Sequence, residues 1–207
     1  MTGAVASEAT LAKIAAMRSA DVARRYQPSA TVFEALKGAP AADGALRTLL
    51  KGTGTAPAIE LLAHALPRRE AVWWAATCVR DTLPEPAPGP ESRLIEASEA
   101  WVRKPSDDAR RAAYAIANQA GMDTAGGLVA MAVFFAGDSL APAGQQAVPP
   151  PGHLVGAMVI NALRLAATRT APEHAEERFR NYLEIGLDIA SGGSGRKREP
   201  KGEEASP

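Results

Sequence analysis

The fold is decided by one stretch, AIELLAHALPRREAVWWAATCVRDTL, at residues Ala58–Leu83. Apolar residues recur at helical spacing on both sides of Pro67, which predicts two short helices joined at this proline. The second helix carries two adjacent tryptophans, Trp73 and Trp74, whose side chains point about 100° apart. One narrow apolar stripe cannot bury both rings. We therefore expect this helix to pack on two sides, or to present one indole to a partner.

The same periodicity extends in both directions along the chain. Ser29, Thr55, Ser106 and Thr124 precede apolar-periodic segments, as N-cap residues do, and glycines follow several of these segments. The predicted helices span about 31–37, 43–51, 56–66, 67–83, 91–103, 106–120, 125–136, 153–168 and 172–189. Alternating β-branched runs are missing, and no fixed-period repeat is present. The chain is therefore predicted to be an all-α, irregular bundle of about eight or nine short helices.

Composition divides the chain into three parts. Residues 1–28 are alanine-rich with alternating charge, and they predict a flexible or loosely docked N-terminal arm. Residues 29–190 form the predicted single helical domain. The charged, glycine-containing segment 191–207 predicts a disordered tail. Within the domain, Pro84–Pro90 predicts a surface linker.

Charge and hydropathy exclude several classes of partner. Lys+Arg and Asp+Glu both number 23, so the basic excess of a typical nucleic-acid-binding protein is missing. The longest weakly charged apolar run, Gly126–Ala136, is about half the length that spans a membrane. The N-terminus lacks the pattern of a signal peptide, and Cys78 is the single cysteine. We expect a cytoplasmic protein that contacts neither membrane nor nucleic acid, with Cys78 as a buried structural thiol.

No set of side chains predicts a metal site, a cofactor or a catalytic centre. Glu60 and His64 are four residues apart, and His174 and Glu177 are three apart, but a metal site needs more ligands. Both pairs are interpreted as contacts on a helix surface. His153 is expected to bond local backbone, or to face the neighbouring loop or a partner. The chain is thus predicted to be non-enzymatic and to need no cofactor.

Two segments are candidates for binding another protein. The first is the corner made by Arg68, Arg69, Trp73 and Trp74, because arginine and tryptophan often carry the energy of protein interfaces. The second is the loop DSLAPAGQQAVPPPG, Asp138–Gly152, which is longer than a helix connection needs and is stiffened by proline. Its candidate residues are Asp138, Val148, Pro149, Pro150, Pro151 and the adjoining His153. The alternative, that this loop merely covers the helix beginning at His153, stays open.

The runs LLAHALPRREAVWWAATCVR, DTAGGLVAMAVFFAGDSLAP and VPPPGHLVGAMVINALRLAA carry a resemblance over about Ala58–Thr168. They resemble an uncharacterised bacterial helical family that is associated with type VI secretion gene clusters. The resemblance implies a bacterial accessory protein and transfers no catalytic residue. Phe134-Phe135 stands where the family pattern leads us to expect a further tryptophan.

These observations favour a protein-binding accessory module, an adaptor or chaperone that serves a secretion system and binds a secretion component or effector. The alternative is a small-molecule-binding or enzymatic helical domain with a pocket under the 138–152 loop.

Overall fold

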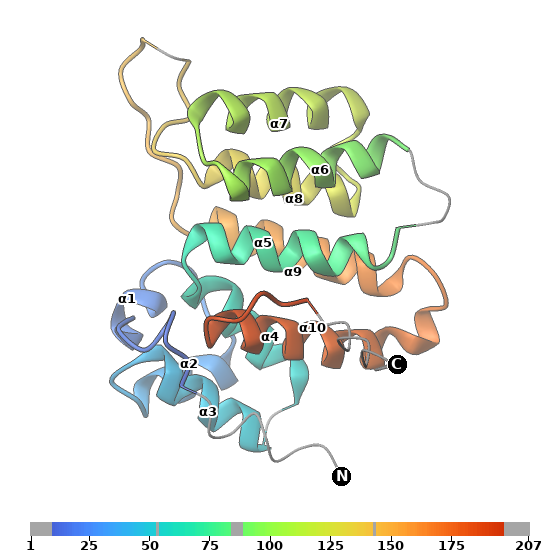
Figure 1. Ribbon diagram of the computed structural model, residues 1–207. Helices are drawn as coiled ribbons and strands as arrows, with labels where there is room; N and C mark the ends of the chain where they lie inside the picture. The colour runs from blue at the N-terminus through green and yellow to red at the C-terminus, as the bar shows by residue number, and fades with distance from the viewer. Residues whose placement is uncertain (1–9, 53, 84–88, 143, 197–207) are drawn as a thin grey trace, which may run out of the picture.

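The computed structural model of the chain describes residues 10–52, 54–83, 89–142 and 144–196, and all regular structure in these ranges is helical (Figure 1). The elements are α1 (Ser19–Ala23), α2 (Ala30–Lys37), α3 (Ala42–Gly52), α4 (Thr55–Ala65), α5 (Arg68–Arg80), α6 (Pro90–Arg103), α7 (Asp107–Ala120), α8 (Ala125–Phe135), α9 (Leu154–Thr168), the 3₁₀ turn η2 (Pro172–His174) and α10 (Ala175–Ala190). The predicted all-α bundle is confirmed, and every expected helix is present. The short α1 is the additional element.

The helices form a stack of layers (Figure 1). Helices α6, α7 and α8 pack together at one end, and α5 and α9 lie in the middle. Helices α4 and α10 follow on the other side of α5 and α9, with α1, α2 and α3 at the opposite end. The long loop between α8 and α9 extends past the start of α7, away from these layers.

Two of the four predicted N-caps are confirmed. The Ser106 hydroxyl accepts a hydrogen bond from the Ala109 N–H at the start of α7, and Thr124 does the same for Gly127 at the start of α8. Ser29 makes no such bond at α2. At α4 the N-cap is Gly54, with φ +82°, so Thr55 is already helical, and its hydroxyl donates instead to Glu176 at 3.2 Å.

Trp74 lies at the centre of the core. Its side chain is fully buried, and its indole N–H donates to the main-chain oxygen of Tyr182 in α10 at 2.7 Å. A Cβ atom at Gly186 would collide with this indole and with Leu62 of α4. Glycine at position 186 therefore lets α10 approach α4 and α5 closely, with the indole filling the space between them.

The ends of the domain are more ordered than we expected. Leu11 and Ile14 are buried in the core, and the Lys13 main-chain N–H donates to Ala190 at the end of α10. Burial of these two apolar side chains docks the described part of the N-terminal arm firmly, because it removes their surface from water. Residues 191–196 also pack on the domain, as described below. Our predictions for residues 1–9, 84–88 and 197–207 lie outside the described residues.

The two tryptophans provide a test of the core. We expect Trp74→Ala to lower the free energy of unfolding by about 3–5 kcal/mol, the usual result of truncating a buried tryptophan. Trp73 is only half-buried, so Trp73→Ala is expected to have a clearly smaller effect. Urea unfolding followed by circular dichroism measures both. Equal losses for the two variants would contradict the central position of Trp74.

Candidate functional site

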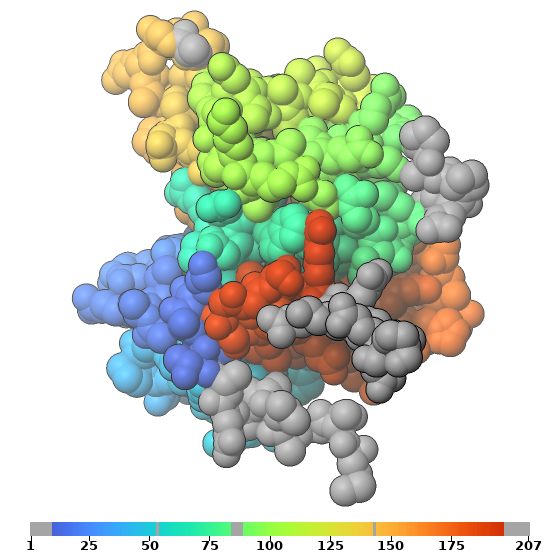
Figure 2. Space-filling view, viewed as in Figure 1, coloured from blue at the N-terminus to red at the C-terminus, as the bar shows by residue number. Residues whose placement is uncertain are grey.

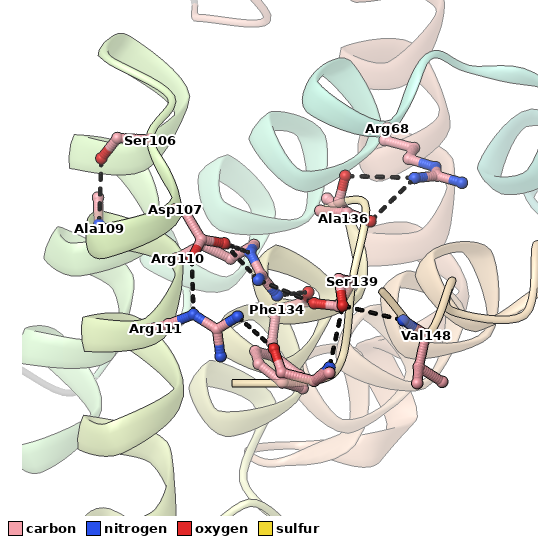
Figure 3. A network of polar contacts seen from close by, with 12 residues as sticks. Arg68, Ser106, Asp107, Ala109, Arg110, Arg111, Phe134, Ala136, Ser139 and Val148 are labelled. Atoms are coloured by element: carbon pink, nitrogen blue, oxygen red, sulfur yellow. Dashed lines mark hydrogen bonds and ion pairs between the residues drawn. The ribbon is translucent and has the colours of Figure 1, made fainter. Parts of the chain in front are cut away.

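The loop between α8 and α9 is fixed by arginine side chains that bond its main chain (Figure 3). Arg110 of α7 is only 2% exposed, although arginine is rarely buried so completely. Its guanidinium donates to the main-chain oxygens of Phe134 at 2.7 Å and Ser139 at 2.9 Å. It also pairs with Asp107 and lies 4.9 Å from the centre of the Phe134 ring. The buried charge thus has both a counter-ion and main-chain acceptors.

Asp107 joins Arg110 to a second anchor of the loop. The other carboxylate oxygen of Asp107 accepts from Arg111 at 2.6 Å, and Arg111 also donates to the main-chain oxygen of Ala141 at 2.6 Å. These hydrogen bonds, from Arg111 first and then Arg110, hold the pKa of Asp107 below its ordinary value. The carboxylate is therefore ionised at neutral pH and orients both guanidinium groups.

Hydrogen bonds of three further residues, Arg68, Ser139 and Leu140, complete the arginine-anchored loop, which is described at residues 136–142 and 144–152. Arg68 of α5 donates to the main-chain oxygens of Ala136 and Gly137, at 3.3 and 3.2 Å. The Ser139 hydroxyl accepts from the N–H groups of Ala141 and Val148, so it ties the outgoing arm of the loop to the returning arm. The Leu140 N–H bonds the Val148 oxygen in the same place. The loop is therefore held in a defined conformation.

The returning arm of the loop presents an apolar, proline-rich edge to solvent. Val148 is 52% exposed, an unusual value for a large apolar side chain in this protein. Pro149 and Pro151 are exposed as well, whereas Pro150 is buried and fixes the arm to the domain. Asp138 and His153 are exposed at the two ends of the loop. Among the described residues, the His153 side chain makes no hydrogen bond, so the expected local bond to backbone is not seen.

A cavity of about 520 Å³ lies between the loop and the corner where α6 meets α7. Its walls include Trp101, Ser106, Arg110, Gln145 and Ala147. This is the place where the alternative interpretation of the sequence expected a pocket, and the volume falls within the range of small-molecule sites. The polar groups of Arg110 and Asp107 in its wall are already engaged with each other and with the loop.

The expected tryptophan corner is not one exposed surface. Trp74 is in the core, and Arg69 donates to the main-chain oxygen of Val102 at 2.6 Å. The indole N–H of Trp73 donates to the main-chain oxygen of Ser194 at 2.7 Å, and the Arg196 guanidinium lies 4.8 Å from its ring centre. The chain's own segment 191–196 therefore covers Trp73.

Polar contacts hold this C-terminal segment in place. The Gly195 N–H donates to the Asp188 carboxylate at 2.7 Å, and the Gly193 N–H donates to the Asp188 main-chain oxygen. Arg196 lies 3.7 Å from the buried carboxylate of Glu99, which also pairs with Arg80 at 2.7 Å. Residues 191–196, which we predicted to be part of a disordered tail, are thus ordered, because they contact charged and aromatic groups of the domain.

The predicted surface contact between Glu60 and His64 differs from the structure. His64 is buried, with its ring stacked on Tyr26 at 3.6 Å between centres, and Glu60 accepts from the Ser29 N–H at 2.9 Å. Burial, followed by the charges of His153 and Arg25, lowers the pKa of His64 to about 4. Burial also raises the pKa of Tyr26. The imidazole is therefore neutral at physiological pH.

His174 and Glu177 form the surface contact that we predicted, at 3.7 Å. Cys78 is fully buried, as predicted, and burial raises the pKa of its thiol far above the ordinary value. In the described ranges, no three His, Cys, Asp or Glu side chains gather as metal ligands would. Across those same residues, each helix is too short or too polar to cross a bilayer.

Arg110 and Arg111 are the important residues that our sequence interpretation missed. Asp107, Arg110 and Arg111 have the three- and four-residue spacing of helix-surface ion pairs, which usually are solvated and contribute little. This pattern was the only available signal, and it does not distinguish a solvated pair from a buried one. Burial of Arg110 arises from the loop that folds over it, thirty residues later in the chain.

Comparison with known proteins places the chain in a family. The sequence model of DUF6931, a family of unknown function, matches residues 45–190. The chain belongs to this family. The resemblance to an uncharacterised family is thereby confirmed, and the match spans the arginine-anchored loop and all its anchors. No curated protein and no solved structure matched the chain.

We expect Arg110→Met to lower the free energy of unfolding by roughly 2 kcal/mol or more, because the main-chain oxygens of Phe134 in α8 and Ser139 in the loop lose their donor. The loop should also become sensitive to proteolysis near Gln145. Urea unfolding and limited proteolysis measure the two effects. Arg111→Met compares the second anchor of the loop, and a smaller loss is expected because its side chain is more exposed. A protease-resistant loop in Arg110→Met would contradict the anchoring role.

His64 predicts a pH dependence of stability. The unfolded chain binds a proton on this residue below pH 6.5, whereas folded His64 does so only near pH 4. Stability therefore falls as the pH drops from 6.5 to 4, by at most about 3 kcal/mol from this group. Urea unfolding across this pH range should show that the free energy of unfolding changes less with pH for His64→Gln than for the native protein. Identical slopes would mean that His64 titrates normally.

Proposed function

We propose that the protein is a non-enzymatic binding module that presents its arginine-anchored loop to another protein. The observation that supports this most is the combination of exposure and order at Val148. This apolar side chain is half-exposed, yet the main chain on both sides of it is hydrogen-bonded or proline-stiffened. Since the loop is ordered before binding, little chain entropy is lost when a partner docks.

The chemistry of the loop indicates the kind of partner. Val148 is followed by three prolines, and such extended segments dock in grooves lined by aromatic side chains. Pro149 and Pro151 are available for such a contact, and the buried Pro150 keeps the edge attached to the domain. The described part of the loop protrudes beyond the neighbouring helices (Figure 2). A secretion component or effector is the first partner to test, given the resemblance described from the sequence.

The test is capture of partners from the native host with a photo-crosslinking residue at position 148. We expect a specific adduct with the native loop, and a large loss of the non-crosslinked complex for Val148→Glu. Phe33→Glu is the matched control, because Phe33 is a similarly exposed apolar residue on α2, remote from the loop. Both variants should melt like the native protein, since neither side chain is buried.

Unchanged partner recovery with Val148→Glu, at a normal melting temperature, would reject the loop as the binding surface. A large drop in melting temperature for this variant would instead support the covering role that the sequence left open.

The second candidate function is binding of a small molecule in the 520 Å³ cavity beside the loop. The observation in its favour is the size of that cavity, together with Trp101 and Gln145 in its wall. A metabolite that raises the melting temperature of the native protein, but not of Ala147→Trp, would favour this function. Ala147 lines the cavity and anchors nothing, so the new indole fills the space and leaves the loop contacts intact.

A further inference from the structure

A second cavity, of about 210 Å³, lies where α4 and α5 meet the N-terminus of α9 and the segment that follows α1. Its volume corresponds to roughly seven water molecules. The lining residues include Arg25, His64, Arg68, Gly152 and Gly156. Four separate parts of the chain therefore contribute to one small site.

The charge of this cavity is positive. Arg25 and Arg68 both line it, and none of the described residues in its wall carries a carboxylate. Among the described residues, only some of the N–H donors of these two guanidinium groups have an acceptor. Arg25 donates to the His64 main-chain oxygen at 3.0 Å and to the Met17 sulfur at 3.2 Å, which is a weak acceptor. Arg68 uses one nitrogen for the two loop carbonyls, and its other donors have no recorded acceptor in the described part of the chain.

The first turn of α9 adds main-chain donors to the same space. Val155 and Gly156 line the cavity at the start of this 15-residue helix. No acceptor is recorded for their N–H groups among the described residues, as is usual for the second and third positions of a helix. The helix dipole also favours a negative charge at this end.

His64 supplies an independent indication of a ligand. It is only 6% exposed, and its Nδ1 atom is buried with no hydrogen-bond partner in the described structure. A Cβ atom at Gly156 would collide with this nitrogen, so Nδ1 lies against the first turn of α9, and both His64 and Gly156 line the cavity. A buried polar atom without a partner is costly, and native structures rarely leave one unsatisfied.

We propose that this cavity binds a phosphate group, held by Arg25, Arg68, the His64 imidazole and the N–H groups of Val155 and Gly156. The donors belong to three side chains and one helix N-terminus, a number that suits the several oxygens of a tetrahedral anion better than the two oxygens of a carboxylate. The site is separate from the exposed edge at Val148, and it does not depend on the proposed function. Binding here would also fix Arg68, one of the loop anchors.

The test is a titration of the full chain with inorganic phosphate at constant ionic strength, followed by NMR of the histidine side chains. The chain has three histidines. We expect the His64 signals to shift and its pKa to rise, because a bound anion favours the imidazolium. His174, which lies on η2 outside the cavity, should not respond. Phosphoserine as a second ligand distinguishes a phosphomonoester site from one for the free ion, and acetate tests a planar anion.

Variants assign the binding to the named residues. Arg25→Gln should weaken phosphate binding by about tenfold or more, the loss expected for one charge-assisted hydrogen bond. Arg164→Gln is the matched control, because it removes the same charge from an exposed position on α9. Gly156→Ala should also abolish binding, because the new methyl group displaces the His64 imidazole. Gly152→Ala is its control: the new methyl group would make only an ordinary contact with Arg25, so this variant should fold normally.

Three results would overturn the proposal. The first is a His64 signal that does not move with either phosphate ligand while the fold is intact. The second is equal weakening by Arg25→Gln and Arg164→Gln, which would indicate a general charge effect. The third is acetate binding as tightly as phosphate. A His64 response that Arg25→Gln weakens and Arg164→Gln does not would support the site.

Discussion

The packing of Trp74 against Gly186 is the constraint on which the arrangement of the helices depends. An indole is the largest side chain, and it can lie between α5 and α10 only because position 186 has no Cβ atom. Its N–H must also find an acceptor once it is buried, and the Tyr182 oxygen provides one. This single contact fixes the spacing of α4, α5 and α10, and α5 in turn carries Arg68 to the loop.

The arginine-anchored loop also depends on a large buried side chain that packs against a glycine, but here the side chain is the charged Arg110. The Arg110 side chain fills the space beside Gly137, and a Cβ atom at position 137 would collide with the Arg110 guanidinium. A buried guanidinium is tolerated only when its donors are satisfied and its charge is balanced. The main chain at the end of α8 and in the loop accepts from these donors, and Asp107 balances the charge. The helices and the loop therefore order each other.

These contacts also connect the two proposed sites. Arg68 bonds the start of the loop and lines the phosphate cavity, and Gly152 ends the loop beside Arg25. A ligand in the cavity and a partner at Val148 would thus act on the same segment of chain from its two ends. In contrast, residues 191–196 contact Trp73, so the chain itself partly covers one of the two surfaces that the sequence offered for binding.

The sequence by itself determined the helices, their order and two of their caps, because periodicity and capping are local properties of the chain. It also identified the loop, since prolines and length are visible without a structure. Only the tertiary structure decided that Trp74 is buried and Trp73 is covered, that His64 lies inside, and that Arg110 is an anchor. Burial of a side chain depends on segments distant in sequence, such as α10 for Trp74 and the α8–α9 loop for Arg110. Local spacing carries no information about those segments.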